Sequence, residues 1–320
     1  MSQRLLILAA LLAAFAASLL LPFDSLSSLF ETDPELGWAL LVELRLPRAA
    51  LALVYGATLG AAGAAIQALF ANPLASPDLT GTTSGAALGA VVTAYLVGAA
   101  GVLAMAIGAV AGAAASLLLL VALAGRRADT STMLLAGLAI SALAGALTTL
   151  ALALAPSPFA FYDAYAWLMG SLVDRSLLQL AFAAVPAALV IVALARLSVP
   201  LDRLALGEDV AESMGHDLPR LRLQIICLSA LGVGACVAIC GAIGFIGLVA
   251  PVFARRLTGG HPGRAILPAA VIGALLLSAA DLISRLAPLG RTLPIGVVTA
   301  LVGAPFFLWL VVRMRWRLRS

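Results

Sequence analysis

Residues 45–48 read Arg-Leu-Pro-Arg, and residues 67–75 read Gln-Ala-Leu-Phe-Ala-Asn-Pro-Leu-Ala. The apolar, Gly-punctuated stretch between them has about 20 residues, enough to cross a bilayer as a helix that rises about 1.5 Å per residue. This places two arginines at one mouth of a membrane helix and a helix-breaking Asn-Pro corner at the other. A gated transmembrane pathway needs such features, whereas a simple anchor does not.

The composition supports a membrane protein. Of the 320 residues, 63% are hydrophobic and 11% are charged, and the mean hydropathy is +1.13, whereas a soluble domain carries about 25% charged residues. All 19 basic residues are arginines, most of them in short connections between apolar segments. The basic pI therefore reflects orientation in a membrane, and we expect lipid but no nucleic acid as a partner.

The pattern predicts an all-α polytopic membrane protein with a single transmembrane domain over residues 1–320. The first apolar segment resembles a signal peptide but lacks a convincing cleavage site, so we interpret it as a retained helix. Ten segments are long enough to span the bilayer: 5–21, 49–70, 82–99, 101–124, 132–155, 176–195, 222–242, 244–258, 266–286 and 295–313.

The arginines predict the orientation. If both termini are cytoplasmic and ten helices alternate, 14 of the 19 arginines lie inside, as the positive-inside rule requires. Glycines at four-residue spacing predict close helix packing, because small residues let helices approach one another in lipid. These glycines are Gly56 and Gly60, then Gly81, Gly85 and Gly89, then Gly108 and Gly112.

The longest polar insertion on the predicted cytoplasmic side covers about residues 203–220. Within it, residues 208–214 have the pattern of a short amphipathic helix with a glycine at either end. A solvated loop is the alternative, but a compact helix with glycine ends is better suited to dock against a rigid partner.

With these features, the chain resembles the permease subunits of FecCD/BtuCD-type (type II) ABC importers. The resemblance runs over nearly the whole chain and rests on many motifs in order. They are Arg45-Leu-Pro-Arg48, Gln67, Asn72-Pro-Leu-Ala-x-Pro77, Gly81-x-x-x-Gly85-Ala86, Leu134-Leu-Ala-Gly137, Leu206-Gly207 to Gly215, Gly241-x-Ile-x-Phe-Ile-Gly-Leu-x-x-Pro251, Asp281-x-x-x-Arg285, and the block from Leu293-Pro294 to Phe307.

The resemblance implies a homodimer of ten-helix subunits in the bacterial inner membrane, with both termini cytoplasmic and helices 2–5 and 7–10 related by an inverted repeat. Two ABC ATPase subunits would bind inside, and a periplasmic substrate-binding protein would deliver a bulky metal chelate from outside. Ferric siderophore is the substrate we favour on family frequency, with haem or cobalamin as the others.

The resemblance also assigns roles at the outer rim. Arg45, Arg48 and Arg285 match positions that pair with carboxylates of the binding protein, and arginine presents a fixed fork suited to such contacts. Two structural alternatives can coexist with docking. The first two arginines could anchor the helix at the membrane interface, and Arg285 could pair with Asp281 one helical turn away.

At the inner end, the resemblance places a cytoplasmic gate at Asn72, Leu74, Ser131 and Thr132. Small polar side chains can cap broken helix ends while lining a wet cavity. Plain capping of the helix that follows residue 130 is the alternative for the Ser/Thr pair.

The segment that would ride in a groove of the ATPase comprises Leu206, Gly207, Glu208, Ala211, Met214 and Gly215. The chain itself has no lysine and hence no P-loop. It is therefore expected to be no enzyme and to hold no cofactor, with ATP and Mg²⁺ on the partner ATPase.

Two positions depart from the family pattern. Val252 stands where His is common, and Thr292 stands where Glu is common, and neither departure undermines the resemblance to the family. Cys236 and Cys240 share a helix face but have no His or Met cluster nearby, so we expect no metal site. An ion-coupled secondary transporter is the alternative function, but it needs intramembrane ionisable groups. Only Asp281 qualifies, and Arg285 accounts for it.

Overall fold

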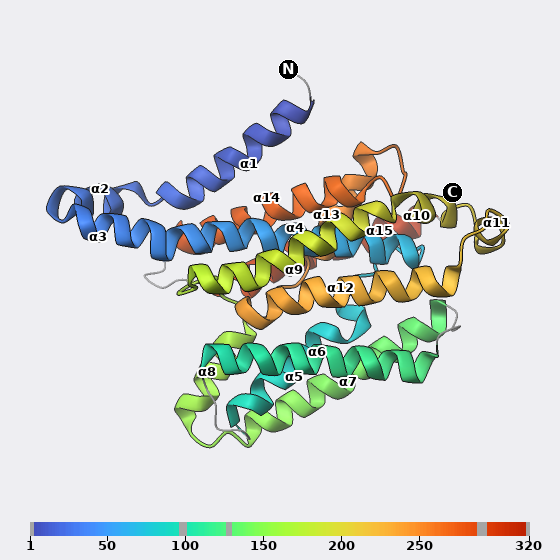
Figure 1. Ribbon diagram of the computed structural model, residues 1–320, viewed down its shortest axis with the longest axis horizontal. Coiled ribbons are helices and arrows are strands. Elements are labelled where there is room, and N and C mark those ends of the chain that lie inside the picture. Colours follow the sequence, from blue (N-terminus) through green and yellow to red (C-terminus); the bar gives the residue numbers. More distant parts are fainter. Residues whose placement is uncertain (1–2, 96–100, 126–129, 287–292, 318–320) are drawn as a thin grey trace.

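The structure is a computed structural model that describes residues 3–95, 101–125, 130–286 and 293–317. Every regular element in these ranges is a helix (Figure 1). In chain order they are α1 (Gln3–Leu20), α2 (Phe23–Thr32), α3 (Pro34–Ala39), the π-helical turn η1 (Leu40–Arg45), α4 (Leu46–Leu69), the 3-10 turn η2 (Pro77–Thr80), α5 (Thr82–Tyr95), α6 (Val102–Ala124), α7 (Thr130–Ala153), α8 (Pro158–Leu168), α9 (Leu177–Arg196), α10 (Ser198–Leu204), α11 (Glu208–Ser213), α12 (Leu218–Cys240), α13 (Ile246–Leu257), α14 (Ile266–Leu286) and α15 (Ile295–Arg317).

The prediction of an all-α polytopic membrane protein is confirmed. In the described part of the chain, six helical stretches have both the length and the apolar composition to cross a membrane. They are Pro34–Leu69, Leu103–Ala124, Ser131–Ala153, Leu177–Arg196, Leu218–Cys240 and Ile266–Leu286, and shorter apolar runs lie at Ala9–Leu20 and Ile295–Leu310. Each of the ten predicted ranges overlaps one helix, but α5 and α13 are only 14 and 12 residues long.

Helix α4 is the centre of the bundle. It is buried along most of its length and packs against α14, α9, α13 and α12. Figure 1 shows α5, α6 and α7 gathered on one side of this central group, with α12 between the two parts. This position matters because α4 carries the predicted rim at one end and the predicted gate at the other.

Glycines set the closest helix crossings, as the sequence predicted. A Cβ at Gly56 or Gly60 would collide with backbone atoms of α14. In the same way, the glycines of α5 meet those of α6, with Gly89 against Gly108. Because any side chain would push these helices apart, the glycine pattern determines how closely they pack. Gly81 plays a different part: it ends η2 with a φ of +78°.

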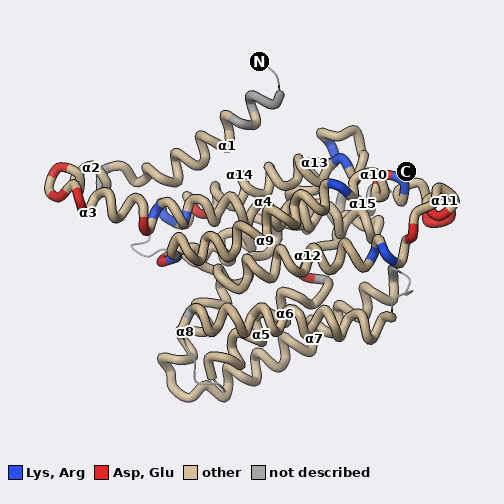
Figure 2. The backbone as a smooth tube through the Cα atoms, in the orientation of Figure 1, with Lys and Arg blue, Asp and Glu red and all other residues tan. Residues whose placement is uncertain are grey.

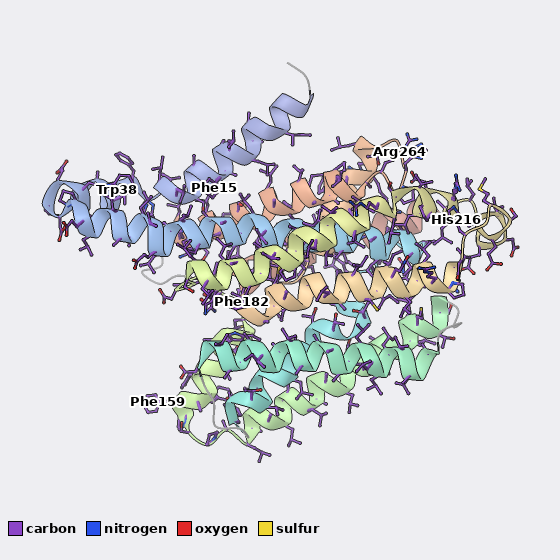
Figure 3. The ribbon with its side chains drawn as sticks, viewed as in Figure 1. Phe15, Trp38, Phe159, Phe182, His216 and Arg264 are labelled. Carbon is purple, nitrogen blue, oxygen red and sulfur yellow. The ribbon has the colours of Figure 1, made fainter. Side chains whose placement is uncertain are left out.

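Charged residues gather at the two ends of the bundle (Figure 2). Arg45 and Arg48 lie at the end where α4 begins, and acidic α11 lies at the opposite end. Figure 3 shows Trp38 and Phe159 at the first end, with His216 and Arg264 at the other. The connections that precede α4 and α9 contain α2, α3 and α8, and Trp38 and Phe159 are exposed there.

Candidate docking rim, gate and coupling segment

The three predicted rim arginines meet where α4 begins and α14 ends. Asp281, on α14, is completely buried, and its two oxygens are shared between two guanidinium groups. Its Oδ1 accepts a hydrogen bond from Nε of Arg48 at 2.8 Å, and its Oδ2 accepts one from Nε of Arg285 at 2.9 Å. Nη2 of Arg285 also contacts Oδ2. Both arginine side chains are mostly buried, so this is a desolvated ion triad that joins two helices.

Two of these arginines also hold the end of α1. Arg45 donates from Nη1 to the carbonyl oxygens of Leu19 and Leu20, at 3.0 and 3.1 Å. Arg285 donates from Nη1 to the carbonyl oxygen of Ser18 at 2.7 Å, and from Nη2 to its Oγ at 2.6 Å. The pair of Arg285 with Asp281, which the sequence offered as an alternative, is therefore present. The structure brings the three rim residues together but uses much of their hydrogen-bonding capacity within the chain.

An open pocket lies over these side chains. It is lined by Arg45, Arg48 and Arg285, by exposed Asp174, and by apolar residues of the flanking segments. Nη2 of Arg48 is buried and has no hydrogen-bond partner. Three guanidinium groups around one pocket favour an incoming anion, and their fork geometry suits carboxylates.

Just after the C-terminal end of α4, Asn72 organises the predicted gate turn. Its backbone N–H donates to the carbonyl of Gln67 at 3.1 Å, which continues the last turn of the helix. Its side-chain oxygen accepts from the N–H of Leu74 at 2.9 Å. The Asn side chain thus satisfies the backbone of an irregular turn, as such residues commonly do. Ser131 and Thr132 lie exposed in the first turn of α7, which begins at Thr130.

The predicted coupling segment forms the short helix α11, one residue shorter than expected. Gly207 and Gly215 flank it with φ values of +115° and +85°, a region that favours glycine. Two side-chain contacts brace the segment. Oε1 of Glu208 pairs with Nη2 of Arg222 on α12 at 2.6 Å, and Nη1 of Arg203 donates to Nε2 of His216 at 2.8 Å.

The side chains of this segment divide into two groups. Leu206, Val210 and Met214 are exposed, so they present an apolar surface at this end of the molecule. Ala211 is fully buried against the chain itself, so its part is to seat the helix. Exposed apolar side chains on a braced helix are suited to contact another protein.

Two polar residues of α4 form hydrogen bonds to the segment after α12 that the sequence did not predict. The buried Tyr55 hydroxyl donates to the carbonyl of Gly241 at 3.0 Å and accepts from the N–H of Ile243 at 3.3 Å. Further along, Nε2 of Gln67 donates to the carbonyl of Leu248 at 3.1 Å. Tyr55 thus holds the irregular link between α12 and α13, and Gln67 holds the first turn of α13. A lone tyrosine inside an apolar helix was the available signal, because a buried hydroxyl needs a partner.

Comparison with known proteins agrees with this architecture. The chain matches the model of the FecCD transport family over residues 5–313. It is 42% identical over 303 residues to the vitamin B12 import system permease protein BtuC of Vibrio cholerae, covering 91% of this chain and 86% of that protein. It is 41% identical over 276 residues to BtuC of Salmonella typhi, covering 85% and 83%.

A solved structure shows the same arrangement of helices. A metal-chelate type ABC transporter in an inward-facing conformation superposes with a TM-score of 0.85 at 29% identity, over 96% of this chain and 97% of that chain. The fold and these matches define a membrane permease of the ABC importer class. The chain belongs to the FecCD transport family. It is thus a multi-pass inner-membrane transport protein, and its family is one of permeases, which does not favour the ion-coupled alternative.

Proposed function

We propose that this chain is the transmembrane subunit of an ATP-driven importer that carries cobalamin from a periplasmic binding protein to the cytoplasm. The observation that supports this most is the 42% identity, over nearly the whole chain, to a permease named for vitamin B12 import. This similarity moves our preference from ferric siderophore, favoured from the sequence, to cobalamin. Ferric siderophore and haem become the comparison substrates of the test.

We propose ten membrane crossings, formed by α1, α4, α5, α6, α7, α9, α12, α13, α14 and α15. The helix packing supports an inverted repeat of helices 2–5 and 7–10, because matching pairs meet in both halves. Helix α4 packs on α14 as α12 packs on α6, and α4 packs on α13 as α12 packs on α5. In each half, a long helix is followed by a short one. The arginine distribution supports cytoplasmic termini.

The assembly we propose contains two copies of this chain, two ABC ATPase subunits that hold ATP and Mg²⁺, and one periplasmic binding protein. Arg45, Arg48 and Arg285 would receive carboxylates of the binding protein. The exposed side of α11 would contact the ATPase, and the turn at Asn72 and Leu74, with Ser131 and Thr132, would close the inner end. Exposed apolar side chains along α7 and α15 support contact with lipid or a second copy.

The test is ATP hydrolysis by the reconstituted complex. This subunit is purified with its ATPase in lipid, and its periplasmic binding protein is added after loading with cobalamin, ferric siderophore or haem. We expect cobalamin to stimulate hydrolysis, and to be transported into vesicles. Stimulation by ferric siderophore or haem alone would overturn the substrate, and no stimulation by any loaded protein would overturn the importer.

Charge reversal at the rim tests docking, and the same change at the opposite end of the molecule is its matched control. The double variant Arg45→Glu/Arg48→Glu should abolish stimulation because like charges would then face each other at the docking surface. Arg264→Glu makes the same kind of change on an exposed side chain at the opposite end. It should leave the affinity for the binding protein unchanged.

A further inference from the structure

The carbonyl groups at the end of α1 have an unusual set of partners. The last four carbonyls of a helix lack intrahelical donors and need others. Here the oxygen of Ala17 accepts from the N–H of Leu21 at 3.0 Å. The next three, from Ser18 to Leu20, accept from Arg45 or Arg285. Two cationic side chains from other helices thus cap this helix, where positive charge is also favoured by the helix dipole.

This cap is a main point of attachment for α1. Figure 1 shows α1 leaning away from the bundle toward its N-terminal end, with its C-terminal end against the start of α4 and the end of α14. Most of its described side chains are exposed or half-buried, whereas Ser18 is fully buried. Loss of the cap would therefore free the C-terminal end of a helix whose other described side chains are mostly exposed or half-buried.

The guanidinium of Arg285 has no unused donor. Its Nε and Nη2 contact Asp281, Nη2 also donates to Ser18 Oγ, and Nη1 donates to the carbonyls of Ser18 and, at 3.4 Å, Leu21. An arginine has five N–H groups, and all five are engaged. A carboxylate that enters the rim pocket can bind this arginine only by displacing one of these acceptors.

We propose that docking of the binding protein and capping of α1 compete for Arg45 and Arg285, so that docking releases the end of α1. This inference rests on the proposed function. Asp281 is a positioning residue in this scheme, because it keeps Arg285 at the rim while the α1 carbonyls are exchanged for partner carboxylates. By reciprocity, docking weakens the α1 cap by the same factor by which the cap weakens docking. A variant with a weaker cap should therefore dock more tightly.

The test measures a distance within the complete transporter. Spin labels are placed at Leu12→Cys on α1 and Leu267→Cys on α14, both exposed positions, in a Cys227→Ala background. Arg45→Gln should broaden the distribution of distances between the labels. Arg48→Gln, which removes a rim charge that is hydrogen-bonded to Asp281 rather than to α1 within the described residues, should leave it unchanged. Equal effects of the two variants would overturn the inference.

The periplasmic binding protein is then added, and docking is checked separately by co-elution. In the labelled protein with an unchanged rim, we expect docking to broaden the distribution of label distances as Arg45→Gln does. If the protein docks and the distances do not change, this inference is wrong and the proposed function stands. If it does not dock in any loaded state, the proposed function fails and the inference fails with it.

Affinity provides a second readout with a defined sign. Ser18→Ala removes one acceptor of Arg285 and should tighten docking about two- to tenfold, the range expected for one hydrogen bond. Ser213→Ala, at the opposite end of the molecule, is the matched control and should not change the affinity. Weaker docking of Ser18→Ala would show that α1 supports the rim and would overturn the competition.

Discussion

Replacement of Asp281 by alanine is the sharpest test of the rim. The carboxylate is fully buried and is shared by Arg48 and Arg285, whose side chains are 13% and 8% exposed. Asp281→Ala therefore leaves two largely desolvated positive charges without their counter-ion. Removal of one partner from a buried pair costs about 3–5 kcal/mol, and we expect a loss in this range in the free energy of unfolding.

An apolar replacement of the whole triad separates lost attraction from uncompensated charge. When all members of a buried ion cluster are replaced by apolar residues of similar size, stability is commonly kept or increased. The triple variant Arg48→Met/Asp281→Leu/Arg285→Leu should thus recover most of the loss. It should remain below the wild type by about 1 kcal/mol for each hydrogen bond to α1 that Arg285 no longer makes.

Equilibrium unfolding in mixed micelles measures these free energies. Asp209→Ala, on exposed α11, is the control for removing an acidic residue and should change stability by no more than about 0.5 kcal/mol. If Asp281→Ala lies within 1 kcal/mol of the wild type, or if the triple variant is less stable than Asp281→Ala, the description of the rim as a desolvated triad is refuted.

Three further variants test the packing, the coupling segment and the brace. Gly60→Val should cost about 3 kcal/mol in thermal unfolding because its side chain would meet the backbone of α14. Gly145→Ala, where a Cβ meets open space, should be neutral or stabilising. Equal effects of the two variants would contradict the glycine-packed crossing. Tyr55→Phe should cost about 1–3 kcal/mol in chemical unfolding, since it leaves two buried backbone groups without their partner, and an unchanged midpoint would argue against the brace. Glu208→Arg should cost about 1–3 kcal/mol, because Glu208 is 52% exposed but the Arg222 side chain is only 8% exposed and would face a like charge. It should also lower transport per ATP hydrolysed, and Arg222→Glu in the same chain should restore transport; failure to restore would separate this pair from coupling.

The helices themselves were largely predictable from the sequence. Long apolar runs cannot leave their backbone groups unpaired in lipid, so they must be helical. The ten expected ranges accordingly overlap helices, and the coupling segment 208–214 ends within one residue of α11. The predicted range 244–258 extends slightly past α13 at both ends, since apolar residues continue into its flanking turns, and the predicted range 82–99 runs beyond Tyr95 into residues outside the described part of the chain.

The docking rim shows where sequence reasoning ended. Asp281 and Arg285, four residues apart on one helix, predict an ion pair by spacing alone. Their link to Arg48 depends on how α4 crosses α14, since 233 residues separate that arginine from Asp281. No local pattern could show that Ser18 and its neighbours would supply acceptors to the same arginines.

The sequence by itself determined the membrane class, the helical segments and the glycine faces, because each follows from local composition and spacing under the demand that backbone polar groups be satisfied in lipid. The tertiary structure alone decided which arginine shares Asp281, that α1 is capped from other helices, and that Tyr55 braces the link after α12. These contacts join residues far apart in the chain. They arise only when helix crossings bring buried charges and unpaired carbonyls together, since each must then find the nearest partner of opposite character.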